Sequence, residues 1–549
     1  MTAAVAASGQ PDRDLRWLRR LWWIALLLVL GPLWLVQRDL WDGVIGSYGL
    51  ERQNFDGIHA WLVPSNWGLM YLIFRGVGWL TQILPLPHWV WIKLLLCASV
   101  VGISLESRRL CSDVLGWDAR SCQAVQLLVL AFPCWYLLYG STFVYVVFIW
   151  WVLLAHRWLH SESRWRQLAG FGLLLASYQV NSNFVMVFAL EAARWICREP
   201  GRRWSWPRSA LIAGSAIAVY LTLRLAFPPR GVYQGYNNLV SPFNAAGLTA
   251  WLRAGLMFAT WLPLIVAPAG LAWLLVRGTP PVPVAPSRSR MLAVAILFAG
   301  ALFAYLAVGK GAPLFVVNLP LAWLGSGAHL GREATQWIYT TVDGWSTRHT
   351  FLLSLPAAIA TVGLIGYASR AATAAASRRA WWAAIGLALV TDLAWTLHGH
   401  AAKLQRIAQE ETIIAALKAH GPPPPGRVDL QIAPAPGWSV WTYEANYWTW
   451  RAWGSSLWAV AAYPAGSPSA AEAALKEREA AVAAVDRRDY NLMHGFQPTG
   501  CRTVWRIQLP PGLTAASLLR TRSGLADPPA ATVTVLSQHC APLEPAKPG

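Results

Sequence analysis

The sequence has little charge, and what it lacks narrows the class of protein. Only 13% of the 549 residues are charged, whereas a soluble domain typically carries about 25%. The seven cysteines form no CxxC pair, so the pattern gives no support to a cysteine-based zinc or dithiol redox site. No small-residue cleavage pattern follows the first apolar run, which favours an uncleaved first membrane span over a removable signal peptide.

Apolar and aromatic residues dominate the chain instead. Hydrophobic residues make up 56% of it, and 35 tryptophans are present. Tryptophan favours the membrane–water interface, because its ring is apolar and its N–H can stay wet. The composition therefore predicts a polytopic membrane protein in contact with lipid. The formal net charge of +19 fits the retention of Lys and Arg in cytoplasmic loops. No basic helix or aromatic–basic platform is present, so nucleic acid is not an expected partner.

Six clusters of basic residues set the expected orientation. Placing all of them on the cytoplasmic side requires an even number of spans between neighbouring clusters. Three apolar runs lie between the first two clusters, and the middle one, residues 67–84, contains Arg75 and ends at Pro85. We therefore expect residues 67–84 to form an interfacial helix and not a span. The clusters lie within residues 13–20, 108–120, 157–166, 194–208, 277–290 and 370–379.

This alternation predicts an all-α polytopic membrane protein with a small C-terminal α+β domain. About 11 transmembrane helices are expected, with the N-terminus in the cytoplasm and the C-terminus outside. We expect a cytoplasmic N-terminus (1–20), a transmembrane domain (21–397) with a long first outer loop (38–87), and a periplasmic domain (398–549) at a bacterial inner membrane. Within the last domain the pattern predicts strands at 427–432, 503–508 and 532–536 and a helix at about 469–487.

Two cysteines, Cys501 and Cys540, stand alone in the C-terminal part. If that part is periplasmic, they share an oxidising compartment and are expected to form a disulfide. The alternative is a pair of buried free thiols.

Polar residues of the apolar region concentrate on the expected outer side. Ionisable residues at a membrane boundary are functional candidates, because their burial is costly unless they are used or paired. They lie in the first outer loop, in the turn between two later spans, and at the outer ends of two further spans. The candidates are Asp39, Asp42, Glu51, Arg52, Asp56, His59, Gln179, Asn181, Asn183, Arg224, Arg348 and His349.

These residue types suit glycosyl transfer from a lipid carrier. Transfer to a hydroxyl needs a base for the proton, and a carboxylate can serve. The leaving lipid phosphate needs positive charge, which Arg supplies with bidentate geometry. The apolar tail of the carrier needs a groove, and a bundle of spans can provide one.

A family resemblance rests on the start of the chain. The stretch Asp39-Leu40-Trp41-Asp42-Gly43 directly follows the first span, and a long outer loop, an even run of later spans and an outer C-terminal domain come after it. Over roughly residues 15–400 this arrangement resembles the GT-C glycosyltransferases.

The resemblance implies a sugar donor on polyprenyl phosphate, an extracytoplasmic glycan or lipid acceptor, and a role in cell-envelope polysaccharide assembly. It implies that Asp39 or Asp42 is the catalytic base, or that the pair holds a divalent ion such as Mg²⁺ or Mn²⁺. Arg348 and His349 match the basic residues that hold the carrier phosphate.

Each candidate has a structural alternative. Asp39 could simply pair with Arg38 at a helix terminus, and Asp42 before Gly43 is also a turn signal. Arg52 and Asp56 have the i,i+4 spacing of a surface ion pair.

The other candidates are equally open to a structural explanation. His59 is a lone histidine, and residues 179–183 could form a hairpin cap. Arg224 could extend its guanidinium to the interface, and Arg348 could anchor the outer end of a span.

Two other functions stay open. An O-antigen polymerase or ligase type of enzyme would depend on outer Arg and His residues and would tolerate changes at Asp39 and Asp42. A transporter should carry charged or helix-breaking residues near mid-membrane, whereas here the polar residues gather at the outer edge. A non-enzymatic envelope scaffold is the remaining alternative.

Overall fold

The computed structural model describes most of the chain. The described residues are 10–37, 40, 43–52, 55, 59, 68–140, 144, 146–178, 183–197, 206–226, 262–279, 286–310, 351–369, 373–434, 440–455, 457–486, 500–527 and 529–540.

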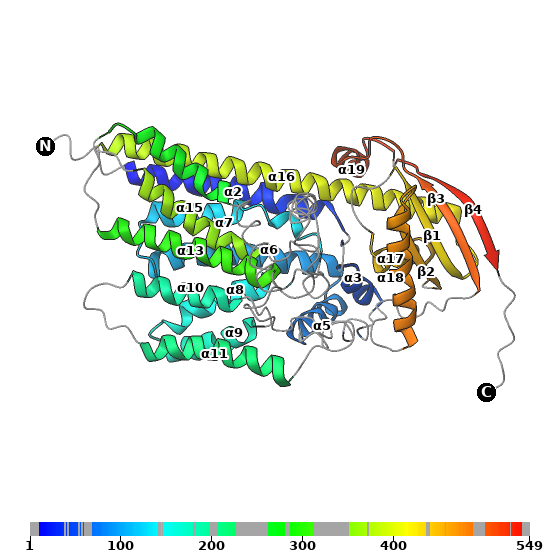
Figure 1. Cartoon of the computed structure of the whole chain (residues 1–549), viewed down its shortest axis with the longest axis horizontal. Helices are drawn as coiled ribbons and strands as arrows, with labels where there is room; N and C mark the ends of the chain where they lie inside the picture. The colour runs from blue at the N-terminus through cyan, green and yellow to red at the C-terminus, as the bar shows by residue number, and fades with distance from the viewer. Residues whose placement is uncertain are drawn as a thin grey trace, which may run out of the picture.

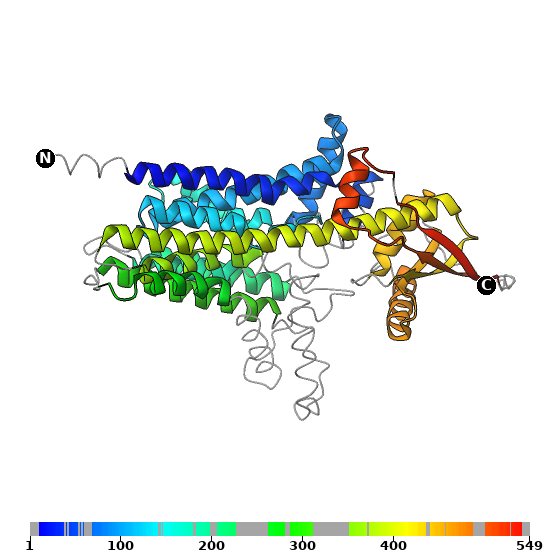
Figure 2. The same cartoon turned by 90° about the horizontal axis from the view of Figure 1, so that it is seen from above.

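A bundle of helices forms the larger part of the molecule, and a small sheet module lies at one end of it (Figure 1). Most helices of the bundle run side by side, and the longest, α16, continues out of the bundle into the module (Figure 2). The elements before the sheet are α2 (Gln10–Leu30), η1 (Gly31–Leu35), α3 (Gly43–Glu51), α5 (Gly68–Ile83), α6 (His88–Asp113), α7 (Ala119–Ala131), η2 (Trp135–Leu137), α8 (Val146–Leu159), α9 (Arg164–Ser177), α10 (Asn183–Ile196), α11 (Trp206–Ala226), α13 (Pro286–Lys310), α15 (Ser354–Ala368) and α16 (Ala374–His420).

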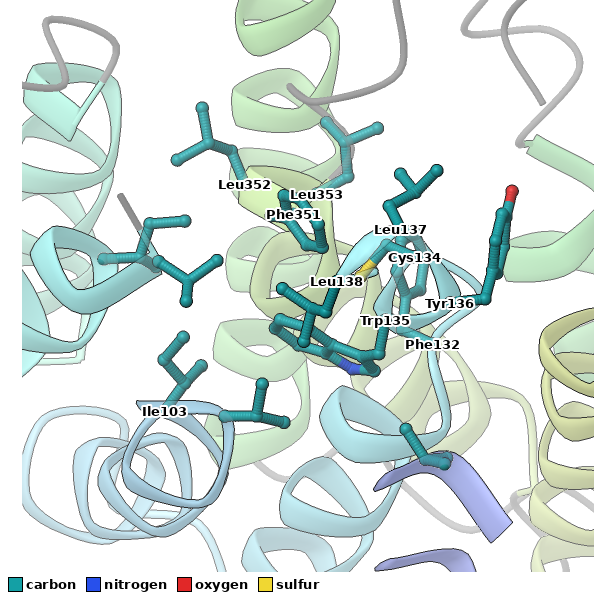
Figure 3. Packing of buried hydrophobic residues seen from close by; sticks show 14 of the residues in the cluster. Ile103, Phe132, Cys134, Trp135, Tyr136, Leu137, Leu138, Phe351, Leu352 and Leu353 are labelled. Carbon is teal, nitrogen blue, oxygen red and sulfur yellow. The ribbon is translucent and has the colours of Figure 1, made fainter. Parts of the chain in front are cut away.

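Large aromatic side chains and close glycine contacts hold the bundle together. Trp135 of η2 is fully buried and packs against Phe351, with 5.6 Å between ring centroids (Figure 3). Gly102 of α6 lies so close to α8 that an added Cβ would come within 2.4 Å of Trp150. Dense packing of this kind makes the interior intolerant of added volume.

Four described helices are long and apolar enough to cross a membrane: Arg13–Leu35, His88–Asp113, Phe351–Ala368 and Ala374–His420. Four shorter apolar helices cover Val146–Leu159, Pro207–Val219, Leu262–Val276 and Ser289–Phe303. The structure therefore establishes an apolar helical bundle, and the count of about 11 spans stays a prediction.

The helix expected at 67–84 is present as α5. It lies across the direction of the bundle helices, which is visible on comparing Figures 1 and 2. A transverse apolar helix is the arrangement expected of an interfacial segment.

The domain boundary expected at residue 398 stays a prediction, and the structure adds a feature that the sequence did not indicate. That position falls inside α16, which continues unbroken from Ala374 to His420. The sequence around 398 contains no proline to interrupt the backbone hydrogen bonds. The helix ends at Gly421, which has a φ of 84°, and a run of prolines follows it. One helix is therefore shared by the bundle and the module.

The sheet module has four strands in the order β2-β1-β3-β4. Strand β1 runs parallel to β2 and β3, whereas β4 is antiparallel to β3. The elements are β1 (Gly426–Ala433), α17 (Thr442–Trp453), β2 (Trp458–Pro464), α18 (Pro468–Asp486), β3 (Cys501–Gln508), α19 (Ala515–Arg522) and β4 (Thr532–Cys540).

A disulfide joins the two C-terminal strands of the module. Cys501 of β3 and Cys540 of β4 are direct partners in the strand register and are covalently bonded. An ion cluster connects the interior of the module to its surface, where the buried Asp429 carboxylate of β1 accepts hydrogen bonds from the buried Arg478 and the exposed Arg502. Hydrogen bonding to Asp429 raises the pKa of Arg502 above its usual value.

Candidate functional site

The first candidate span ends where the bundle meets the sheet module. Lys93 of α6 donates a hydrogen bond to the carbonyl of Leu33 over 2.6 Å. Arg522 at the end of α19 donates to the carbonyl of Leu35 over 2.5 Å and also pairs with Glu411 of α16 at 2.6 Å. We call this region the junction. It is the place where η1 and Leu40 meet α6, residues 132–139, α16 and α19.

A buried tyrosine–histidine pair lies at the junction. The backbone N–H of Leu40 donates to the carbonyl of Tyr139 over 3.2 Å. The hydroxyl of Tyr139 lies 3.0 Å from Nδ1 of His400 on α16, and both side chains are buried. Leu40 is itself fully buried. The segment after the first span is therefore attached to a polar pair in an otherwise apolar interior.

Lys93 brings a buried positive charge to the same region. Its side chain is 3% exposed, and the ammonium lies 5.0 Å from the ring of Trp89. A cation at the end of an apolar helix is costly and is typical of a position that meets an anion.

Two of the predicted residues lie where the end of α3 approaches the module. Glu51 at the end of α3 lies 3.1 Å from Arg451 of α17. Next to this ion pair, Tyr48 packs edge-to-face on Trp450 with 4.8 Å between centroids. Arg52 donates to the hydroxyl of Tyr48 over 3.2 Å. The structure therefore places Glu51 and Arg52 beside the module.

Two other predicted residues have contacts of a structural kind. The exposed ring of His59 packs edge-to-face on Tyr71 at 5.2 Å. Asn183, at the start of α10, is fully buried and donates to the carbonyls of Ser177 and Phe148 over 2.9 and 3.3 Å. These bonds attach the start of α10 to the end of α9 and to α8.

The side chains of the remaining eight predicted residues lie outside the part of the chain that the structure describes. Arg224 belongs to α11, but its side chain is outside the described part. The residues outside the described part altogether are Asp39, Asp42, Asp56, Gln179, Asn181, Arg348 and His349.

A buried ion network docks the module on α16. Arg406 donates to Glu410 over 2.7 Å and also pairs with Glu444 of α17. The indole N–H of Trp448 donates to the other oxygen of Glu410 over 3.2 Å. The three charged side chains are at most 5% exposed. Such a network is stable only when every member is satisfied, so it fixes the orientation of α17 on α16.

Sequence patterns did not identify Lys93, Tyr139, His400 or Arg406. Tyr139 lies in an apolar run, and His400 lies in a helix that the pattern assigns to the tail. The one usable signal was Lys93, a charged residue inside a run long enough to span a membrane.

Comparisons with known proteins give one structural likeness. The chain matches no protein-family model and no curated protein. It is similar to a solved structure described as the crystal structure of ArnT from Cupriavidus metallidurans bound to undecaprenyl phosphate, with 12% sequence identity and a TM-score of 0.39. The match covers 94% of this chain and 98% of that one.

Proposed function

We propose that the chain is an integral membrane glycosyltransferase of GT-C-like architecture. It transfers a sugar from a polyprenyl-phosphate donor to an extracytoplasmic glycan or lipid acceptor in cell-envelope polysaccharide assembly. The proposed topology has about 11 spans, with the N-terminus in the cytoplasm and the sheet module in the periplasm of a bacterial inner membrane.

The position of Leu40 carries this proposal. Leu40 lies between Asp39 and Asp42 in the sequence, and its backbone is bonded to Tyr139 at the junction. The apolar bundle on one side of the junction suits a lipid tail, and the polar module on the other side suits a hydrophilic acceptor. A lipid-linked sugar needs both environments at once.

Two observations support the orientation. Ion pairs connect several basic clusters to one another within the bundle: Asp14 pairs with both Arg120 and Arg378, and Glu106 pairs with Arg157. Clustered Arg and Lys favour the cytoplasmic side. The Cys501–Cys540 disulfide of the module suits an oxidising compartment such as the periplasm.

The proposed reaction is a single displacement at the anomeric carbon. The acceptor oxygen attacks that carbon as its bond to the phosphate oxygen breaks, and polyprenyl phosphate leaves with the bonding electron pair. Asp39 or Asp42 takes the proton from the acceptor hydroxyl. Lys93, Arg224 and Arg348 with His349 neutralise the phosphate.

Other residues have supporting roles in the proposal. Seven further residues are assigned to the surroundings of the sugar and acceptor: Glu51, Arg52, Asp56, His59, Gln179, Asn181 and Asn183. A divalent ion such as Mg²⁺ or Mn²⁺, if bound by Asp39 and Asp42, would supply further charge for the leaving phosphate.

The test is an assay of the purified full-length chain with a panel of polyprenyl-phosphate sugars. Asp39→Asn and Asp42→Asn are compared with Asp113→Asn, which changes an exposed aspartate at the end of α6. We expect either Asp39→Asn or Asp42→Asn to lower turnover by about 10²–10⁴-fold, because general-base catalysis is lost. The control should retain wild-type turnover.

Turnover that survives both Asp39→Asn and Asp42→Asn would refute the proposed mechanism. If Arg348→Ala abolishes activity in that case, the polymerase or ligase alternative takes its place. Absence of transfer from every polyprenyl-phosphate sugar would refute the donor class.

A further inference from the structure

A second polar cluster lies inside the bundle. His156 lies on α8 and His160 directly follows Leu159, the last residue of that helix. Their spacing of four residues places the two side chains on one side of the helix end. Their Nε2 atoms lie 2.9 and 3.0 Å from the same oxygen, Oε1 of Glu191 on α10. The side chains are buried, with 1%, 11% and 8% exposed for His156, His160 and Glu191.

This cluster is far from the junction. Arg157, the residue after His156, pairs with Glu106 of α6. Glu106 is 13 residues beyond Lys93 on the same helix, which corresponds to about 20 Å along its axis. Lys93 marks the junction, so the cluster belongs to the opposite, basic end of the bundle.

We propose that His156, His160 and Glu191 form a buried binding site for a divalent transition metal, best suited to Zn²⁺. One ligand atom from each residue can be chosen so that all three lie within 4.8 Å of one another. Two imidazoles and one carboxylate form a ligand set used for zinc, with bond lengths near 2.0–2.2 Å that place tetrahedral ligands about 3.4 Å apart. Small outward shifts of the observed groups would admit the ion.

A neighbouring hydroxyl already orients the carboxylate. Ser209 of α11 donates to Oε2 of Glu191, which leaves Oε1 directed at both histidines. Outer hydrogen bonds of this kind fix metal ligands in position and tune their affinity. Three helices, α8, α10 and α11, therefore contribute to one site, and a bound ion would hold them together.

The surroundings select the class of metal. Arg194 lies close enough to act electrostatically on both histidines, and Arg208 acts on His160. These charges oppose a cation, so binding must rely on strong bonds to nitrogen. Imidazole ligands suit Zn²⁺, whereas Mg²⁺ and Ca²⁺ prefer sites made of oxygen ligands. The site therefore requires a metal of the zinc type.

The experiment measures metal content and stability of the full-length protein in detergent. The protein is loaded with Zn²⁺, exchanged into metal-free buffer and analysed by elemental mass spectrometry, alongside His160→Gln and Glu191→Gln. Two matched controls are Glu106→Gln, an ion-pair change at the same end, and His400→Gln, a buried histidine at the other end. We expect about one zinc per chain in the wild type and both controls, because both controls keep all three ligands of the proposed site.

We expect the metal to be lost in His160→Gln and Glu191→Gln. A chelator should lower the unfolding midpoint of the wild type and leave that of His160→Gln unchanged. If Glu191→Gln does not fold, His160→Gln carries the test alone, because its side chain is the most exposed of the three.

Three results would overturn the site. One is the absence of zinc in the wild type after loading. The cluster would then be a set of hydrogen-bonded side chains that binds no metal. Another is a His160→Gln variant with as much zinc as the wild type. The third is retention of Mg²⁺ or Ca²⁺ in preference to Zn²⁺.

Discussion

Two sets of ion pairs, one at each end of the bundle, differ in how far their members are removed from water. At the basic end, Glu106 is buried, but its partners Arg109 and Arg157 are 54% and 31% exposed. At the junction end, Arg406, Glu410 and Glu444 are all at most 5% exposed. The first set joins bundle helices to one another, whereas the second joins the bundle to the module.

This difference determines what each set can do for the protein. A pair with exposed members gains little, because water already solvates the charges. A fully buried set is not a large net source of stability either, but losing one member leaves an uncompensated charge inside. The Arg406 network therefore has one tolerated geometry, which suits the proposed role of the junction in holding the segment around Leu40 in place.

The largest effect is expected from Arg406→Met. It leaves the carboxylates of Glu410 and Glu444 buried without their shared cation, so we expect a loss of about 3–5 kcal/mol in the free energy of unfolding. The unfolding midpoint in detergent and proteolytic release of the module provide the measurement. Lys476→Met, which breaks an exposed pair with Glu472, is the control and should change neither. An unaltered midpoint in Arg406→Met would show that the network does not hold the module.

A smaller effect is expected from Tyr139→Phe. The change removes the hydroxyl bonded to His400 and leaves a buried nitrogen without that partner, at a cost of about 1–3 kcal/mol. Transfer activity should fall as well, because Leu40 is bonded to the backbone of the same residue. Tyr71→Phe is the matched control, since its ring contact with His59 needs no hydroxyl. Equal activity in the two variants would separate the tyrosine–histidine pair from catalysis.

At the basic end, Glu106→Gln should cost about 1 kcal/mol or less, because water can solvate the arginines that remain. Its unfolding midpoint should lie well above that of Arg406→Met, and its transfer activity should match the wild type. If Glu106→Gln is as damaging as Arg406→Met, the contrast between the two ends is wrong.

The smallest effect is expected from Glu51→Gln. The pair with Arg451 is partly exposed, with 24% and 44% of the side chains accessible, so its loss should cost no more than about 1 kcal/mol. Added salt should reduce the difference further, because it screens exposed charges. A rise in the KM for the acceptor without a change in stability would support the proposed place of Glu51 beside the acceptor, whereas a loss of stability well above about 1 kcal/mol would contradict the expected small effect.

Local patterns were sufficient for several elements. The alternating residues of 427–432, 503–508 and 532–536 match β1, β3 and β4, and the helix at 469–487 matches α18. Strand β2 was not predicted, because all but the last of its residues are buried and the apolar run shows no alternation. The unbroken course of α16 was also missed, because its apolar half resembles a span and its polar half a separate helix.

The candidate site was less predictable than the fold. A lone His at 400 and a Tyr at 139 are separated by 261 positions, and no local pattern relates them. The His156–His160 spacing is visible in the sequence, but Glu191 and Ser209 come from two further helices. The spacing of the two histidines alone indicates no metal site, because the carboxylate that completes the cluster is 31 residues beyond His160.

The sequence by itself determined the membrane character of the chain, the transverse helix at 67–84 and most of the module, since apolar runs, charge distribution and strand alternation are local properties. Tertiary structure decided which polar residues meet: Tyr139 with His400, Arg406 with Glu444, and His156 and His160 with Glu191. The physical reason is that burial makes these groups costly unless they find partners, and the packing of distant helices alone supplies those partners.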